Sequence, residues 1–326
     1  MRADPIADIV RSMNLTGAVF LKADFSEPWA ITAHVAEEDC PPFMPTPQRL
    51  IAYHVVLEGE FSAVVTDDAG REFRHRARVG DVVIFPHNKT HLLESAPGLD
   101  PVCGDDLVLP ASDGEFAQIR YGGGGDRTRI LCGFIGSDAA SSPLLDVLPE
   151  MLVIPITSLE TRNWIQSSAA MAATRLITGN LMSKAMVSGL CELLLSEALR
   201  LSVASAAEHN GWLNGMAHPR MARALARIHR ALDCPPSVAD LAKEAGMSRS
   251  AFVDRFTEIL GVSPRQYMLD ERMKLAAALL RDGELSSAQI AERVGYDAPE
   301  AFSRAFKRQF GLAPRLWLHR EMDAGA

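Results

Sequence analysis

A repeat near the C-terminal end of the sequence constrains the fold more than any other feature. Residues 251–265 and 301–315, which both begin Ala-Phe and end Pro-Arg, are identical at six of fifteen positions. Upstream, the pattern apolar-Ala-x3-Gly at residues 241–246 recurs at 290–295, so the offset changes from fifty to forty-nine. One extra residue directly after the second glycine accounts for this change. Each copy therefore predicts a helix, a tight glycine turn and a second helix, the unit that places its second helix in the major groove of DNA.

The composition is typical of a soluble globular protein with two or three domains. The chain has 326 residues, of which 48% are hydrophobic and 23% charged. No apolar run approaches the roughly 20 residues of a membrane span, and the N-terminal residues lack the apolar core of a secretory signal. Five scattered cysteines without a C-x-x-C pair predict reduced thiols in the cytoplasm and neither a disulfide framework nor a zinc site.

Charge is distributed unequally along the chain. The net charge of −8 by itself argues against a nucleic-acid partner. Residues 1–218 contain 16 basic and 27 acidic side chains, whereas residues 219–326 contain 17 basic and 14 acidic ones, so the two parts carry −11 and +3. The basic excess therefore lies in the segment with the repeat, where contacts with DNA phosphates require it.

Short apolar runs interrupted by Gly, Pro and Asp predict a β-rich N-terminal region of about 135 residues. Residues 53–57 and 61–65, on either side of Glu58-Gly59-Glu60, are expected to pair as a hairpin. Further strands are expected at residues 71–79, 82–85, 116–121 and 129–134.

From about residue 143 the apolar spacing becomes helical. Apolar residues between Met182 and Leu201 recur at i+4 and i+7 steps, which predicts a helix that ends near residue 206, and another helix is expected at 159–174. This apolar stripe fits packing inside its own domain, or alternatively a seam between two copies of the chain. Residues 205–219, with two Asn-Gly pairs, are typical of a linker.

Helix signals fill the chain beyond Pro219. Helices are predicted at residues 221–232, 238–245, 249–260, 264–280, 288–294, 299–309 and 314–320. The expected N-cap residues are Ser237, Ser248, Ser286 or Ser287, and Asp297. The helix that starts at Pro264 would be about 25 Å long, which suits two recognition helices spaced by about one turn of DNA.

The second helices of the two copies share their buried faces and differ in their exposed faces. Phenylalanines four residues apart mark the buried faces, Phe252 and Phe256 in the first copy and Phe302 and Phe306 in the second. The opposite faces carry Ser250, Val253, Asp254 and Thr257 in the first copy, and Glu300, Ala301, Ser303, Arg304, Lys307 and Arg308 in the second. One scaffold with two different exposed faces favours two DNA-reading helices over the alternative, a helical domain without DNA contacts.

Residues 219–320 resemble the DNA-binding domain of AraC/XylS-family transcriptional regulators. The resemblance rests on Gly295-Tyr296, on the sequence Ala-Phe-Ser-Arg-Ala-Phe-Lys at 301–307, and on Phe310-Gly311 followed by Pro314. Residues 238–248 resemble the first helix–turn–helix of the same family. The resemblance implies that the chain binds double-stranded DNA in the major groove.

The resemblance implies a role for ten residues of the two second helices. Base contacts are expected from Ser250, Val253, Asp254, Pro299, Glu300, Ala301 and Arg304, and phosphate contacts from Arg249, Lys307 and Arg308. Arg304 suits a bidentate contact with guanine, which would contribute about 1–3 kcal/mol of discrimination. Asp254 could accept a hydrogen bond from cytosine or repel phosphate, so we expect the second copy to supply more of the affinity.

The N-terminal region resembles the cupin β-barrel. Val-Val-Leu-Glu-Gly-Glu at residues 55–60 and the spacing Gly80-Asp81-x4-Pro86-x4-His91 are similar to its two motifs. Cupin enzymes hold their metal with a His-x-His pair, a Glu and a later His. Only His91 fits these positions, so neither a metal nor a cofactor is expected. The barrel mouth predicts an effector pocket, unless the histidines only satisfy buried hydrogen bonds. Its expected residues are Arg49, Tyr53, His54 and His91.

The sequence as a whole predicts a multidomain α+β protein. We expect a cupin-like β-barrel sensor at residues 1–142, a helical dimerisation segment at 143–206, a linker at 207–219, and an all-α DNA-binding domain at 220–321 with helix–turn–helix units at 237–260 and 286–309. The resemblance implies a cytoplasmic regulator that acts as an activator or a repressor of transcription, a homodimer on promoter DNA, with a small-molecule effector and RNA polymerase as further partners. The alternative to this non-enzymatic function is a metal-dependent cupin oxygenase or isomerase fused to a DNA-binding tail.

Overall fold

A computed structural model describes most of the chain and divides it into two compact units. The described residues are 4–13, 15–36, 38, 40, 47, 49–109, 117–137, 145, 148–155, 182–205, 211–283 and 285–324. Residues 13–138 and 148–202 make up one unit, here called the β unit. Residues 1–12, 139–147 and 203–326 make up the other, here called the helical unit.

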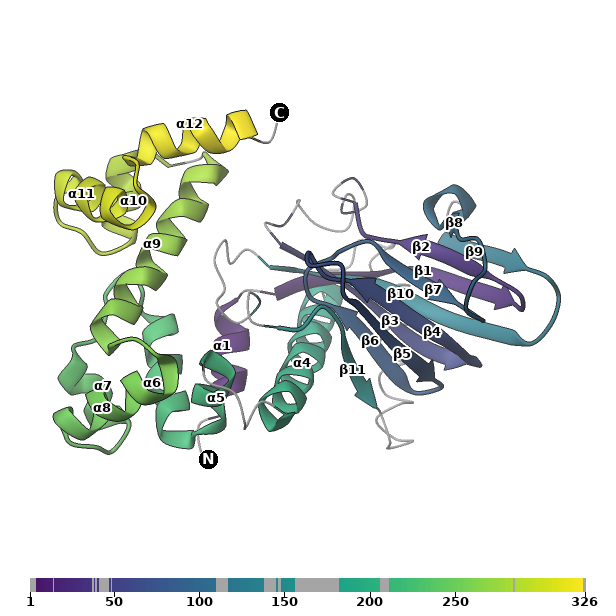
Figure 1. Cartoon of the computed structure of the whole chain (residues 1–326), viewed down its shortest axis with the longest axis horizontal. Coiled ribbons are helices and arrows are strands. Elements are labelled where there is room, and N and C mark those ends of the chain that lie inside the picture. The colour runs from purple at the N-terminus through teal and green to yellow at the C-terminus, as the bar shows by residue number, and fades with distance from the viewer. Residues whose placement is uncertain are drawn as a thin grey trace. The chain divides into compact units, whose positions relative to one another are not determined.

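Two β-sheets form the framework of the β unit (Figure 1). The larger sheet has six strands in the order β11-β6-β3-β10-β1-β9, and the smaller has five in the order β5-β4-β7-β2-β8. The strands are β1 (Leu15–Ser26), β2 (Ala30–Ala33), β3 (Arg49–Glu58), β4 (Glu60–Thr66), β5 (Glu72–Arg78), β6 (Asp81–Phe85), β7 (His91–Glu94), β8 (Val102–Cys103), β9 (Ala117–Gly122), β10 (Arg127–Ser137) and β11 (Leu152–Pro155). This arrangement confirms the expected cupin-like, β-rich fold of the N-terminal region.

Strands β3 and β4 follow each other directly but lie in different sheets, so the expected hairpin is wrong. β3 pairs with β6 and β10, whereas β4 pairs with β5 and β7. The chain changes sheet at Gly59, which has a φ of +74° and lies so close to β10 that a Cβ would be 2.4 Å from the Arg127 carbonyl oxygen. The apolar residues of both strands thereby reach one core from opposite sides, which a paired hairpin would not allow.

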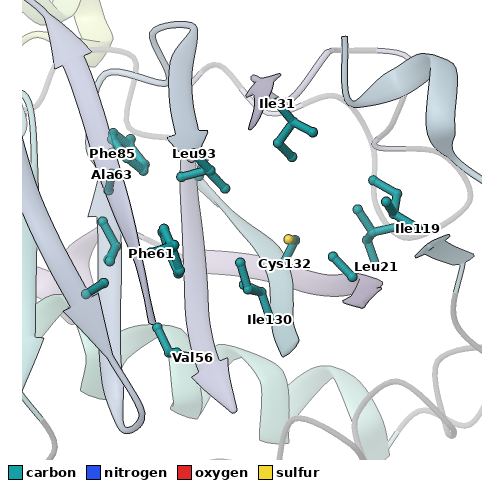
Figure 2. Packing of buried hydrophobic residues seen from close by; sticks show 14 of the residues in the cluster. Leu21, Ile31, Val56, Phe61, Ala63, Phe85, Leu93, Ile119, Ile130 and Cys132 are labelled. Carbon is teal, nitrogen blue, oxygen red and sulfur yellow. The ribbon is translucent and has the colours of Figure 1, made fainter. Parts of the chain in front are cut away.

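The core of the β unit lies between its two sheets. Phe25, Val56 and Phe134 contribute from the larger sheet, and Phe61 and Leu93 from the smaller one, all of them fully buried. Figure 2 shows several of these side chains converging from strands of both sheets. Burial of this apolar surface is the main force that holds the two sheets together.

Helix α4 (Met182–Ser205) belongs to the β unit and packs against the larger sheet. Its Cys191 lies so close to Gly17 of β1 that a Cβ on that glycine would meet the sulfur at 2.5 Å. The helix confirms the predicted end near residue 206, whereas the predicted helix at 159–174 falls outside the described residues. Helical structure was also expected at Leu152–Pro155, but this segment is strand β11, because its continuous apolar run pairs with β6 at the sheet edge.

The helical unit consists of short helices and one longer one. They are α1 (Pro5–Ser12), α5 (Trp212–Ala217), α6 (Pro219–Arg230), α7 (Val238–Glu244), α8 (Arg249–Leu260), α9 (Pro264–Asp282), α10 (Ser287–Arg293), α11 (Pro299–Phe310) and α12 (Pro314–Ala324). Helix α5 occupies part of the expected linker, where Trp212 and Met216 are buried against α6 and α8. These two apolar anchors convert a Gly- and Asn-rich segment into a packed helix.

The N-terminal helix α1 packs against α6 and therefore belongs to the helical unit. Ile9 and Val10 are buried, and Asp8 forms an ion pair with Arg230 of α6 at 3.0 Å. Its sequence position had placed α1 with the β-rich region, but its apolar face is covered by a segment more than two hundred residues away.

Helix α9 connects two helix–turn–helix units with separate cores. The second core is formed by α9, α10, α11 and α12 around Phe302, Phe306 and Trp317. The 19 residues of α9 span about 28 Å. Among the described residues, no helix is both long and apolar enough to cross a membrane.

Candidate nucleic-acid interface and effector cavity

The two helix–turn–helix units share their turn chemistry. Gly246 and Gly295 have φ values of +63° and +73°, and the next residue donates its backbone N–H to the carbonyl of Ala242 in the first unit and of Ala291 in the second, at 2.9 and 2.8 Å. The turn between α10 and α11 is one residue longer than the turn between α7 and α8. This confirms the extra residue that the repeat offset predicts.

The buried faces of the two second helices carry the same residue type at the same spacing. The rings of Phe252 and Phe256 lie 5.5 Å apart in α8, and those of Phe302 and Phe306 lie 5.7 Å apart in α11. Each pair packs on fully buried apolar residues of the preceding helix and its C-terminal end, namely Leu241, Ala245, Ile290 and Val294. These contacts fix which face of α8 and α11 remains open to solvent.

The ten residues expected to contact DNA all lie outside the cores. Val253 and Ala301 are half-buried; the exposed ones are Arg249, Ser250, Asp254, Pro299, Glu300, Arg304, Lys307 and Arg308. Arg304, Lys307 and Arg308 form no ion pair with another described residue, so their charges are available to a ligand. The exposed face of α11 is thus more basic than that of α8, which carries Asp254.

Arg272 of α9 holds the turn of the second unit and was not singled out by the sequence motifs. Its guanidinium donates to the carbonyl oxygens of Val294 and Gly295 at 2.5 and 2.6 Å, and it stacks over the Tyr296 ring at 4.4 Å. Partial burial lowers the pKa of Arg272 from its ordinary value. Both carbonyls are at the C-terminal end of α10, where cationic donors are favoured by the helix dipole. Arg272 therefore positions α11 against α10.

Serine N-caps start three of the expected helices, but Asp297 caps none. Ser237 and Ser286 form capping boxes, with side chains that accept from the backbone N–H three residues ahead, and Ser248 accepts in the same way. The N-cap of α11 is Ala298, which makes no side-chain capping bond. The expected cap at Asp297 is wrong because the longer turn shifts the helix start by one residue, and Pro299 at the first position needs no N–H acceptor.

A cavity of about 260 Å³ lies between the two sheets of the β unit. Its walls are mainly apolar, and Leu21, Ile31, Ile119 and Cys132 point toward this common space in Figure 2. The complete lining is Leu21, Ala23, Ile31, Ala33, His34, Val35, Glu38, Ala52, His54, His91, Gly104, Asp105, Val108, Ala117, Ile119, Cys132 and Gly133. Strands that are distant in sequence thus enclose one ligand-sized space.

Two of the four predicted pocket residues line the cavity. His54 of β3 and His91 of β7 line it. Tyr53 is fully buried beside Cys191, because neighbouring strand residues point to opposite faces of the sheet. Arg49 lies in a separate shallow depression beside Pro86 and His87. Sequence reasoning did not find the apolar wall, because its strand residues come from five strands and share no local motif.

A chain of hydrogen bonds passes through the two cavity histidines. Nδ1 of His91 lies 2.9 Å from the Lys89 carbonyl oxygen, which can only accept, so this nitrogen carries the proton. Nε2 of His91 is then an acceptor for Nε2–H of His54 at 2.8 Å. The remaining nitrogen of His54 accepts from the Cys132 thiol, 3.2 Å away. All four ring nitrogens are therefore satisfied inside the protein.

The environment keeps these groups uncharged. Burial lowers the pKa of His54 well below its ordinary range, with a further contribution from His91. Burial also lowers the pKa of His91 to about 4, despite the bond to Lys89, and raises that of the Cys132 thiol to about 12. At neutral pH the deep wall of the cavity consequently carries no formal charge.

The histidine pair does not fit the metal centre of cupin enzymes. Structural and catalytic metals are held by three or four protein ligands, whereas the described residues contain no group of three or more His, Cys, Asp or Glu side chains placed around a common point. The two Nε2 atoms, which would face a metal, are bonded to each other instead.

The N-terminal and the C-terminal part of the chain each match a known protein family. Residues 4–204 match a cupin family and residues 241–320 match a helix–turn–helix domain family. An AraC-like transcription regulator of Streptomyces lividans is 35% identical over 239 residues, which cover 72% of this chain and 76% of the relative. The chain belongs to the AraC family of transcriptional regulators. Its DNA-binding domain is therefore of the AraC type, with α8 and α11 as the second helices of the two units.

Two further known proteins are similar to different shares of the chain. The regulator AlkR of Acinetobacter baylyi is 28% identical, and the alignment covers 96% of this chain and 98% of AlkR. The solved DNA-binding domain of AdpA, in complex with a target DNA, is 29% identical and covers 37% of this chain and 90% of that structure, with a TM-score of 0.27. The cupin match at residues 4–204 and the helix–turn–helix match at 241–320 make the chain an AraC-family regulator with a cupin-type N-terminal region.

Proposed function

We propose that α8 and α11 are the two recognition helices and that they read adjacent major-groove segments of one promoter site. The observation that carries this proposal is the pair of matched buried faces with unlike exposed faces. Ser250, Val253 and Asp254 of α8, and Pro299, Glu300, Ala301 and Arg304 of α11, are the base-reading positions. Arg249, Lys307 and Arg308 neutralise phosphates, and each would make the affinity more sensitive to salt.

The β unit is proposed to act as the sensor of this regulator. A small molecule in the cavity beside His54 and His91 would stabilise one arrangement of the chain over another and so change its affinity for DNA. The proposed domains are the sensor at residues 1–142 without α1, which packs on α6, a dimerisation segment at 143–206, a linker at 207–219 that includes the packed helix α5, and the DNA-binding domain at 220–321. Helix α4 would supply the seam of a homodimer, which would activate transcription in the cytoplasm through RNA polymerase.

The enzyme alternative has less support than the regulatory one. A cupin oxygenase or isomerase needs a metal, and the satisfied histidine pair offers no ligand set for it. The alignment with AlkR, a relative named as a transcriptional regulator, covers 96% of this chain. Metal analysis of the purified protein distinguishes the two functions, because stoichiometric iron, manganese or zinc would support an enzyme.

Selection of bound fragments from genomic DNA, followed by gel shifts, tests the proposed function. The full chain should enrich a small set of sites and bind them in a salt-dependent, sequence-preferring manner. Arg304→Ala should weaken binding to the selected site, whereas Arg220→Ala, which removes an exposed charge from α6, should leave the site preference unchanged. Binding of all sequences alike, or no binding at low salt, would exclude the proposal.

A further inference from the structure

We propose that the cavity between the two sheets takes an uncharged, predominantly apolar molecule and excludes carboxylates of the same shape. This inference rests on the proposed sensor function and adds the chemical class of the effector. It follows from three properties of the cavity wall, which are its charge, its hydrogen-bonding state and its volume.

The charged side chains of the cavity wall disfavour binding of an anion. No Lys or Arg is among the seventeen described residues that line the cavity, and the charged groups there are Glu38 and Asp105, both exposed. The nearby His34 lies 3.9 Å from Asp105 and pairs with it when protonated. A carboxylate near Glu38 and Asp105 would meet like charge, and one deeper inside would be buried without a counter-ion, which is strongly unfavourable.

The ring nitrogens of the two histidines in the cavity wall already have hydrogen-bond partners within the protein. Lys89, His91, His54 and Cys132 form a chain in which every imidazole nitrogen already has a partner. The stacked ring of Phe85, 3.7 Å from that of His91 between centroids, covers one side of this chain. A polar ligand group gains a bond from the histidines only by breaking one of these, whereas an apolar surface leaves all of them intact.

The remaining wall is aliphatic and of limited size. Leu21, Ile31, Ala52 and Ile119 contribute from strands of both sheets, and Figure 2 shows three of these around the space beside Cys132. A dry cavity of about 150 Å³ is known to hold benzene. The 260 Å³ available here therefore suits a substituted single ring or a compact aliphatic molecule of similar bulk.

Three ligands of nearly equal shape but different charge test whether the cavity prefers an uncharged molecule. They are 4-isopropylbenzyl alcohol, 4-isopropylbenzoate and 4-isopropylbenzylammonium, titrated into the full-length protein at pH 7.5 by calorimetry, with thermal shift as a second readout. The alcohol should bind and raise the unfolding temperature, because a ligand that binds only the folded state stabilises it. The benzoate and the ammonium should each bind at least ~10-fold more weakly. Binding of either ion as tight as that of the alcohol, or no binding of the alcohol, would overturn the proposal.

Substitutions at Ala117 test whether the alcohol occupies this cavity. Ala117 of β9 is half-buried and lines the space, whereas the side chain of the next residue, Gln118, lies outside the lining. Ala117→Phe should abolish binding of the alcohol and Gln118→Phe should retain it. Ala33→Phe repeats the block from β2. Ala117→Arg should shift the preference toward the benzoate, since it adds the missing cation. If the Phe variants fold and still bind the alcohol with unchanged affinity, the cavity is not its site.

The ligand class and the sensor role can fail separately. Binding is measured without DNA, and the effect of the alcohol on affinity for a selected DNA site is measured afterwards by gel shift. Tighter binding of the benzoate overturns the ligand class whatever happens on DNA. Preferential binding of the alcohol with unchanged DNA affinity supports the ligand class and argues against the sensor role.

Discussion

The imidazoles of His54 and His91 join the two sheets of the β unit, with their Nε2 atoms 2.8 Å apart. His54 is on β3 of the larger sheet and His91 on β7 of the smaller one. The bond requires that one ring donates and the other accepts, so it exists only while one of the two facing nitrogens carries a proton and the other does not. The pair therefore connects the protonation of two buried side chains to the contact between the sheets.

Acidification should destabilise the β unit through this pair. The pKa of His91 is about 4 in the folded chain against an ordinary value of 6.5. Between these values the unfolded state binds more protons, so the free energy of unfolding should fall by about 1.4 kcal/mol per pH unit from this group as pH decreases. Above pH 6.5 the group should contribute no pH dependence.

Urea unfolding of the full chain at pH 7, 6 and 5 measures this effect. His91→Gln should be less stable at pH 7, because it loses the stacking on Phe85, and should show a shallower loss of stability at acid pH. Curves for the two proteins that stay parallel from pH 7 to 5 would contradict the assignment.

The two turn glycines should respond differently to alanine. Gly246 and Gly295 both have positive φ, which costs alanine about 1–2 kcal/mol. A Cβ on Gly246 meets nothing within 4 Å, whereas one on Gly295 would lie 2.4 Å from the Asp233 carbonyl oxygen and 3.1 Å from the Arg272 guanidinium. Gly295→Ala should therefore be the more destabilising by at least about 1 kcal/mol in urea unfolding of the helical unit. Equal losses would show that backbone strain alone decides the effect.

Loss of the side chain before α10 should destabilise the protein more than loss of the side chain before α11, because only α10 has a side-chain N-cap. Ser286→Ala removes the side chain that accepts from the Gln289 backbone N–H, and should cost about 1 kcal/mol of stability. Asp297→Ala should change stability by less than about 0.5 kcal/mol, because Ala298 is the N-cap of α11. Thermal unfolding of both variants beside the parent chain provides the measurement. A loss at Asp297 as large as that at Ser286 would reinstate Asp297 as a cap.

On a selected DNA site, α11 should contribute more affinity than α8. Arg304→Ala should cost about 1–3 kcal/mol and relax the base preference at one position. Asp254→Ala should cost less, since an exposed carboxylate near phosphates gains little from DNA. Lys307→Gln should lower affinity for all sequences and reduce the slope of log affinity against log salt by about 1. An Asp254→Ala loss equal to or greater than that of Arg304→Ala would reverse the ranking of the two helices.

The helical unit was largely predictable because its signals are local. Glycine turns, serine caps and phenylalanines four residues apart act within a few positions of each other, so the limits of α7 to α11 follow from the sequence to within one or two residues. The same local information predicted the longer turn before α11. It could not reveal Arg272, whose acceptors lie more than twenty residues further along the chain.

The sequence by itself determined the repeated helix–turn–helix units, their buried faces and the strand content of the N-terminal region. Only the tertiary structure decided that β3 and β4 separate into different sheets at Gly59, and that α1 packs on α6. It also decided which residues enclose the cavity, where His54 and His91 meet and Arg49 and Tyr53 do not. The physical reason is that these features depend on pairing and burial between segments far apart in the chain, and a local pattern specifies that a strand needs a partner without specifying which one.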